Sequence, residues 1–103
     1  MQIKTYLSGP MTGLPNFNYP EFNRVAALLR AKGEFVFNPT EHNWDVNNFP
    51  IREAFATYCN FICLEADKIV LLKGWQNSLG VSAELALAKN CGLIVEEWAD
   101  DAN

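Results

Sequence analysis

A strand, a loop of small residues and a helix follow one another between residues 68 and 90, and this succession constrains the fold most. Residues 68–72 are a short run of apolar and β-branched side chains, which is typical of a buried strand. The loop after them is rich in Gly, Asn and Ser, and residues 78–90 are rich in Ala and Leu, as in a helix. Such a helix begins with free backbone N–H groups that bind an anion or a polar ligand.

The same alternation of strand and helix extends over the rest of the chain. We predict strands at residues 3–8, 35–37, 68–72 and 93–95, and helices at residues 21–32, 50–65 and 78–90. The order βαβαβαβ predicts an α/β fold, a small doubly wound parallel sheet of about four strands in a flavodoxin-like sandwich of three layers. Residues 40–49 are expected to be a long loop and residues 96–103 a frayed acidic tail. No linker divides the chain, so we expect one domain over residues 1–103.

The composition argues against several classes of function. The formal net charge of −4 is unsuited to general binding of polymeric nucleic acid, which needs a basic surface. No apolar run approaches the roughly 20 residues of a membrane span, and no signal peptide opens the chain. We therefore expect a cytoplasmic protein without a membrane partner.

The three cysteines are an odd number and include no second pair with metal-binding spacing, so no metal site and no cofactor are predicted. Cys59 and Cys63 lie four residues apart on a predicted helix, and we expect them to be buried, reduced thiols on one face. His42 is interpreted as a solvated loop residue without a function.

Polar and small residues gather at the carboxyl ends of the predicted strands, where doubly wound sheets bind ligands. They are Tyr6, Ser8, Met11, Asn16, Asn38, Trp75, Asn77, Ser78 and Glu84. Gly9 and Gly13 follow the first strand and would let the backbone approach a ligand closely. Glu84 is the only acid between Asp67 and Glu96 and has apolar neighbours, so it is the first candidate for chemistry. An exposed helix residue is the alternative interpretation of Glu84.

Two segments resemble those of a known group of enzymes, and a third resembles a small uncharacterised subfamily described as similar to it. Residues 6–13 (YLSGPMTG) look like the opening of the nucleoside 2-deoxyribosyltransferase superfamily, and residues 78–85 (SLGVSAEL) are similar to the segment that carries its nucleophilic glutamate. The spacing of six between Ser78 and Glu84 matches the branch that hydrolyses 2′-deoxynucleoside 5′-monophosphates. Residues 66–75 are similar to a small uncharacterised subfamily of the DUF4406 type, frequent in phages and bacteria. The resemblance covers nearly the whole chain.

This resemblance implies how the candidate residues would act. Glu84 would attack the anomeric carbon of a 2-deoxyribose and form a covalent glycosyl-enzyme, with Tyr6 orienting the nucleophile. Water or a second base would resolve the intermediate, and the helix dipole would hold Glu84 ionised at neutral pH. The nucleoside or nucleotide would lie against Ser8, Gly9, Pro10, Met11, Gly13, Asn16, Asp67, Gly74, Trp75, Ser78 and Gly80. Among these, Ser78 would bind a 5′-phosphate or 5′-hydroxyl, and Trp75 or an aromatic of the Trp44 loop would stack on the base.

Several of these residues also have a purely structural interpretation. Asp67 is placed to cap the turn into the third strand, and Tyr6 alternates with core residues of the first strand. Ser78 is a good helix N-cap whether or not it binds phosphate. From the residues alone, the structural and functional roles stay open.

One position departs from the pattern of the superfamily. A second carboxylate is expected about eight residues before Asp67, and this chain has Cys59 there, followed by Asn60. Neither is a general acid of the usual kind. Three hypotheses follow: a deoxyribosyltransferase or deoxynucleotide N-glycosidase, a non-catalytic nucleotide-binding module, and a protein-interaction scaffold. Because members of the superfamily commonly complete their site with a neighbour, we also expect a homodimer or a larger homo-oligomer.

Overall fold

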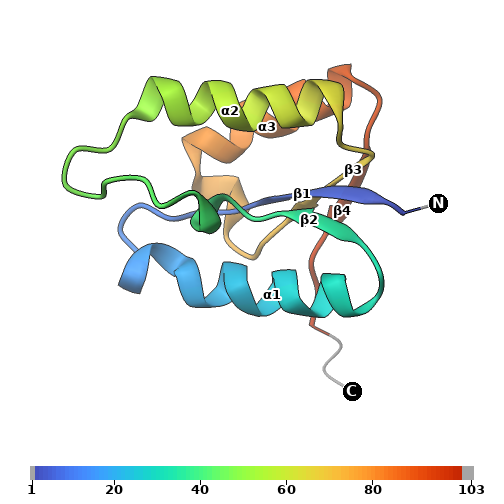
Figure 1. The fold of residues 1–103 in the computed structure, drawn as a ribbon, viewed down its shortest axis with the longest axis horizontal. Coiled ribbons are helices and arrows are strands. Elements are labelled where there is room, and N and C mark those ends of the chain that lie inside the picture. The colour runs from blue at the N-terminus through green and yellow to red at the C-terminus, as the bar shows by residue number, and fades with distance from the viewer. Residues whose placement is uncertain (1, 101–103) are drawn as a thin grey trace.

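The computed structural model describes residues 2–100, in which strands and helices alternate along the chain (Figure 1). The strands are β1 (Lys4–Ser8), β2 (Phe35–Phe37), β3 (Lys68–Leu71) and β4 (Ile94–Glu97). The helices are α1 (Tyr19–Ala31), α2 (Ile51–Leu64) and α3 (Leu79–Asn90). All strand pairs are parallel and the sheet order is β2-β1-β3-β4. The doubly wound α/β fold predicted from the alternation is confirmed, and the direction of winding reverses between β1 and β3.

Helices cover both faces of the sheet, with α1 on one side and α2 and α3 on the other (Figure 1). Successive side chains of a strand point to opposite faces, so β1 divides its residues between two cores. Leu7 packs with α1, whereas Tyr6 packs with α2 and α3. Ser8 is two residues from Tyr6 and therefore faces the α2–α3 side as well. The hydroxyl groups of Tyr6 and Ser8 therefore both lie on the face of the sheet that α3 covers.

The predicted boundaries of helices and strands agree with the structure to within about two residues, but the predicted tail does not. The last strand was expected at residues 93–95 and instead extends over Ile94–Glu97. Charged residues are accepted there because Glu96 lies 3.3 Å from the buried ammonium group of Lys68, which also binds Glu34 at 3.1 Å. The prediction of a frayed tail is wrong for residues 96–100, since Trp98 donates its backbone N–H to Leu71 and packs against the α1 core. Residues 101–103 lie outside the described part of the chain.

No helix within residues 2–100 is long and apolar enough to cross a bilayer.

Candidate functional site

Glu84 lies in the second turn of α3, only 7% exposed, with its carboxylate against the carboxyl end of β1. The hydroxyl of Ser8 donates a hydrogen bond to Oε1 at 2.7 Å, and the hydroxyl of Tyr6 donates one to Oε2 at 3.0 Å. Each carboxylate oxygen thus has its own donor from the same strand. The interpretation of Glu84 as an exposed helix residue is wrong.

The sequence of α3 explains why this glutamate points inward. Ser78 caps the helix by accepting a hydrogen bond from the backbone N–H of Val81 at 3.3 Å, which fixes where the helix begins. Val81, Leu85 and Ala88 form the buried stripe of α3, and Glu84 falls within this stripe at helical spacing. The structural role proposed for Ser78 is thereby confirmed.

Burial controls the protonation of the site. Desolvation raises the pKa of Glu84 to about 7, although the hydrogen bonds from Ser8 and Tyr6 act in the opposite direction. The expectation that the helix dipole holds Glu84 fully ionised at neutral pH is therefore incorrect. Burial, and then the neighbouring carboxylate, raise the pKa of Tyr6 well above its ordinary value, so its hydroxyl stays a donor.

Two residues of α2 complete the surroundings of Glu84. Burial raises the pKa of the Cys59 thiol, and the nearby charge of Glu84 raises it further. The same two causes raise the pKa of Tyr58, while a hydrogen bond from Trp44 lowers it. The Trp44 indole N–H donates that bond to the Tyr58 oxygen at 2.9 Å. Because Tyr58 accepts this bond, its own O–H hydrogen can be donated elsewhere.

Tyr58 is a candidate functional residue that the sequence analysis did not identify. Its helical spacing is that of a core residue, and its ring packs in the core with Tyr6, with 6.2 Å between the ring centroids. The sequence feature that could have drawn attention to Tyr58 is the aromatic residue Trp44 in the polar loop before α2. The Trp44 ring stacks on His42 at 5.7 Å. The His42 ring lies 6.2 Å from the Tyr58 ring and Trp44 binds the Tyr58 oxygen, so both residues hold this loop against Tyr58.

Several of the glycines predicted to contact the ligand are required by the local backbone conformation or packing. A side chain at Gly9 would come within 2.8 Å of Leu72 Cβ, so this glycine allows β1 and β3 to continue side by side. Gly74 has a φ of +88° and faces Pro10, and Gly13 has a φ of +84°, so both permit turns. Gly80 lies in the first turn of α3.

The loop after β1 has an unusual backbone. Asn16, Phe17 and Asn18 all have φ angles between 52° and 63°, a left-handed conformation that is rare for residues other than glycine. Asn18 supports the turn by donating its side-chain N–H to the Pro10 carbonyl at 3.0 Å. Met11, in contrast, packs against the α1 core, on the other side of the sheet from Glu84.

Asp67 is likewise not brought to Glu84, and Trp75 makes contacts of its own. Asp67 precedes β3 and accepts a hydrogen bond from the backbone N–H of Lys4 at 2.9 Å, at the amino end of the sheet. Since Glu84 lies at the carboxyl end, Asp67 is away from the site. Its side chain has a structural role, but it binds the start of β1 instead of capping the turn into β3. Trp75 packs against the α2–α3 core and donates its indole N–H to Glu97 at 3.1 Å.

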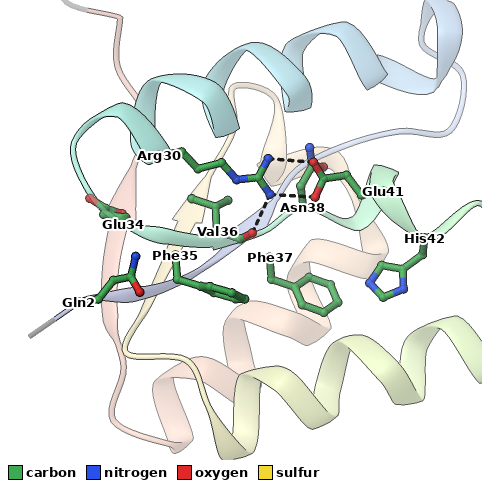
Figure 2. A pocket seen from close by; sticks show the side chains of 9 residues that line it. All are labelled: Gln2, Arg30, Glu34, Phe35, Val36, Phe37, Asn38, Glu41 and His42. Carbon is green, nitrogen blue, oxygen red and sulfur yellow. Dashed lines mark hydrogen bonds and ion pairs between the residues drawn. The ribbon is translucent and has the colours of Figure 1, made fainter.

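Two hollows on the surface lie away from Glu84, and the second of them includes Gly74 and Trp75. A hollow of about 490 Å³ lies along β2, where Figure 2 shows the Arg30 guanidinium between Glu41 and the Val36 carbonyl. Arg30 binds Glu41 at 2.8 Å and this carbonyl at 2.9 Å. The Arg30 side chain therefore covers part of β2, which is an edge strand of the sheet. A second hollow of about 570 Å³ lies beside Trp75 at the ends of β3 and β4. Glu84 lines neither hollow.

No cluster of three or more His, Cys, Asp or Glu side chains within residues 2–100 is arranged to hold a metal ion.

The family model described as "Domain of unknown function (DUF4406)" matches residues 3–97, and the chain therefore belongs to this family. This confirms the DUF4406 part of the resemblance noted in the sequence, whereas the relation to the deoxyribosyltransferase superfamily stays a prediction. A comparison with functionally curated proteins found no match.

Proposed function

We propose that this DUF4406 protein cleaves or transfers the N-glycosidic bond of 2′-deoxyribonucleosides or their 5′-monophosphates, with Glu84 as the nucleophile. The observation that carries the proposal is the buried carboxylate of Glu84, held by Tyr6 and Ser8 where the strand order reverses. Ligands of doubly wound sheets bind at this place. A pKa of about 7 leaves a substantial share of Glu84 ionised, and therefore nucleophilic, at neutral pH.

The reaction would run in two displacements at the anomeric carbon. Ionised Glu84 attacks this carbon while the bond to the base breaks, and the base leaves with the electron pair. The product is a glycosyl ester of Glu84 with its configuration inverted. Water or a second base then attacks the same carbon from the opposite face and releases the carboxylate, so the overall configuration is retained. The hydroxyls of Tyr6 and Ser8 orient the carboxylate and stabilise it when it is released.

Tyr58 would assist the leaving base in place of the missing second carboxylate. Its raised pKa keeps the phenol protonated at neutral pH. Trp44 fixes the position of the Tyr58 oxygen, and the free hydrogen can be donated to a ring nitrogen of the base. Cys59 lies at the position where the superfamily has an acid, but a thiol S–H is a weaker hydrogen-bond donor than a phenol O–H.

The start of α3 would bind the 5′ end of the substrate. The first backbone N–H groups of a helix have no partner within the helix, and here they belong to Leu79 and Gly80. A phosphate or hydroxyl beside them would also meet the positive end of the helix dipole. Ser78 would contribute from its position as N-cap.

A non-catalytic nucleotide-binding module is the second candidate. It is favoured by the low exposure of Glu84 and by the presence of Cys59 where an acid is expected. Thermal-shift measurements with 2′-deoxynucleosides and their monophosphates test for binding, since a specific ligand raises the melting temperature by mass action. Base release from the same compounds separates the two candidates, and no binding at all would leave the interaction scaffold.

We further propose that the protein assembles as a homodimer or a larger homo-oligomer. The helices α2 and α3 both begin at the carboxyl end of the sheet, where the candidate site lies. Their first residues, Ile51 and Leu79, are 68% and 88% exposed, although both are large and apolar. A second copy that covered these side chains would also shield the site from water.

A further inference from the structure

β4 is an edge strand, and its outer side has no neighbouring strand in the sheet formed by residues 2–100. Ile94 donates its backbone N–H to the carbonyl of Asp67, just before β3, and so bonds to the inner side. Alternate residues of a parallel strand bond to opposite sides. The N–H and C=O groups of Val95 and Glu97 therefore point outward, where they offer two donors and two acceptors to a further strand.

The other edge strand, β2, is protected in a way that β4 is not. The outward residue of β2 is Val36, because Phe35 donates its N–H to the carbonyl of Ile3 on the β1 side. The Val36 carbonyl accepts a hydrogen bond from Arg30 at 2.9 Å (Figure 2). Among residues 2–100, no side chain covers the outward backbone groups of β4 in this manner. An uncovered edge of this kind is a template for pairing with another strand.

The side chains of β4 divide it into an apolar and an acidic half. Ile94 is 59% exposed and Val95 is 40% exposed, although both are large and apolar. Glu96 is already paired with a buried ammonium group. Glu97 instead accepts a hydrogen bond from a neutral group, the indole N–H of Trp75, and forms no ion pair within residues 2–100. The charge of Glu97 can therefore bind a cation from a partner.

The hollow of about 570 Å³ continues this surface at the carboxyl end of β4. Its lining includes the indoles of Trp75 and Trp98 and the carboxylate of Glu97. The other charged residues of the lining are Lys73 and two carboxylates that bind Arg24, namely Glu21 and Asp100. Indole rings beside a carboxylate favour a guanidinium or ammonium group, since cation–π attraction adds to the ion pair. A long basic side chain next to Glu97 would have room here.

The end of α2 is another exposed apolar surface, but it presents no strand. Leu64 is 75% exposed, and Cys63 is exposed as well, which corrects the expectation that Cys59 and Cys63 are both buried. Cys59 is half-buried. Because a helix end has no row of outward backbone groups, an extended peptide cannot pair with it as it can with β4.

We propose that β4 binds an extended peptide segment of another protein, in which apolar residues stand next to Lys or Arg. The backbone of the peptide bonds to Val95 and Glu97, its apolar side chains cover Ile94, and its basic side chain reaches Glu97 and the adjoining hollow. In such strand addition the backbone bonds supply affinity and the side chains supply specificity. The inference does not depend on the proposed reaction, because peptide binding is measured without a nucleotide.

A second copy of this chain is less suited to the same edge. If two copies of β4 pair antiparallel around Val95, Glu97 lies opposite Leu93 of the other copy. If they pair around Glu97, two carboxylates lie opposite each other, which is destabilising. Neither register gives Glu97 a cation. The homo-oligomer proposed above uses a different surface, the first residues of α2 and α3.

The test is an NMR titration of the ¹⁵N-labelled protein with two synthetic peptides. In one peptide Val-Ile precedes Arg-Lys, and the other has the reversed sequence, so both strand directions are sampled. We expect the amides of Val95 and Glu97 to exchange rapidly in the free protein and to become protected at least tenfold by one of the peptides. The amides of Ile94 and Glu96 bond toward β3 and should be protected throughout. A peptide with Glu-Glu in place of Arg-Lys should bind about tenfold more weakly.

Two variants of β4 sharpen the test. Val95→Pro removes an outward N–H without removing a bond to β3, so it should abolish binding. Glu97→Lys should reverse the preference and bind the acidic peptide more tightly than the basic one. Glu53→Lys, at an exposed position of α2, is the matched control and should bind like the wild type. Circular dichroism establishes that each variant is folded, and Glu97→Lys keeps the test valid if Val95→Pro is not.

Other results would overturn the proposal. These are the absence of binding by both basic peptides, equal binding of the basic and acidic peptides, or changes confined to residues outside β4 and its hollow. Protection of the Val95 and Glu97 amides without any peptide would show that a second copy occupies the edge, and would equally overturn it.

Discussion

The hydroxyl of Ser8 lies 2.7 Å from Glu84 Oε1, although 76 residues separate the two in the chain. This hydrogen bond joins the end of β1 to α3, next to the place where the strand order reverses. Ser8, the small last residue of β1, thus binds the carboxylate of Glu84 in α3. The chemistry expected of Glu84 depends on this contact and on its counterpart from Tyr6.

The first prediction concerns the protonation of Glu84. Ser8→Ala removes a hydrogen bond that lowers the pKa of this carboxyl, so the pKa should rise above 7, by roughly one unit. Carbon-detected NMR titration of the Glu84 side chain measures this change. Ser82→Ala, on the exposed face of the same helix, is the matched control and should leave the titration unchanged. An unchanged or lower pKa in Ser8→Ala would contradict the role given to this hydrogen bond.

The second prediction is a pH-dependent gain in stability for Glu84→Gln. Burial raises the pKa of Glu84 from 4.5 in the unfolded chain to about 7 in the folded protein. Between these values the folded state binds the extra proton, so the wild type loses stability as the pH rises through 7. The loss amounts to roughly 3 kcal/mol above that range.

Urea denaturation at several pH values checks this result. Glu84→Gln should be more stable than the wild type at about pH 8.5 and close to it at about pH 4.5. Glu53→Gln, at an exposed position of α2, controls for the loss of one surface charge. A constant difference between Glu84→Gln and the wild type across the pH range would show that the carboxylate is not desolvated in solution.

The third prediction separates the chemical role of Tyr58 from its packing. Tyr58→Phe keeps the ring in the core and removes the hydroxyl, so the protein should fold while kcat for base release falls by about 10²-fold. The KM should change little if the phenol acts mainly on the leaving base. The loss should be smallest for substrates with a leaving base of low pKa, which need the least assistance. An equal loss for all substrates would indicate that Tyr58 only shapes the site.

The fourth prediction is that the protein is a homodimer or a larger homo-oligomer at micromolar concentration. Light scattering coupled to size exclusion should report at least twice the mass of one chain, and Leu79→Glu should shift the protein toward the monomer. Lys89→Glu, at an exposed position of the same helix, controls for the new charge. A monomeric wild type would overturn the proposed assembly.

The fold could be predicted from the sequence because the elements have recognisable patterns of apolar residues. Apolar residues repeat at helical spacing in α1 and α2, and β3 is a continuous apolar run, as central parallel strands are. The end of the chain was misjudged because acidic residues are rare in strands. Glu96 is accepted in β4 through its contact with the buried Lys68, and such a long-range ion pair leaves no local signal.

The site was accessible only in part. The position of Glu84 in the stripe formed by Val81, Leu85 and Ala88 indicates burial, and the first strand had already suggested Tyr6 and Ser8. Their contacts with Glu84 require the strand order, which local patterns do not specify. Asp67 was predicted to lie in the site, although it precedes β3. In a parallel sheet, a residue that precedes its strand lies at the amino end of the sheet, away from Glu84.

The protonation of Glu84 was misjudged for a different reason. The helix dipole, which favours an ionised carboxylate, acts mainly within the first turn and is weak beside the cost of burying a charge. Glu84 lies in the second turn and its largest perturbation is desolvation. Tyr58 was overlooked because a tyrosine can satisfy the core pattern and still present its hydroxyl to a site.

The central claim is that Glu84 is the nucleophile of an N-glycosidic reaction. Base release from 2′-deoxynucleosides and their 5′-monophosphates, measured for the wild type beside Glu84→Gln and Glu84→Ala, tests it most directly. We predict release by the wild type that increases with pH through about 7, and a loss of more than about 10³-fold in both variants. Undiminished release in folded Glu84→Gln, or no release by the wild type from any of these substrates, would contradict the claim.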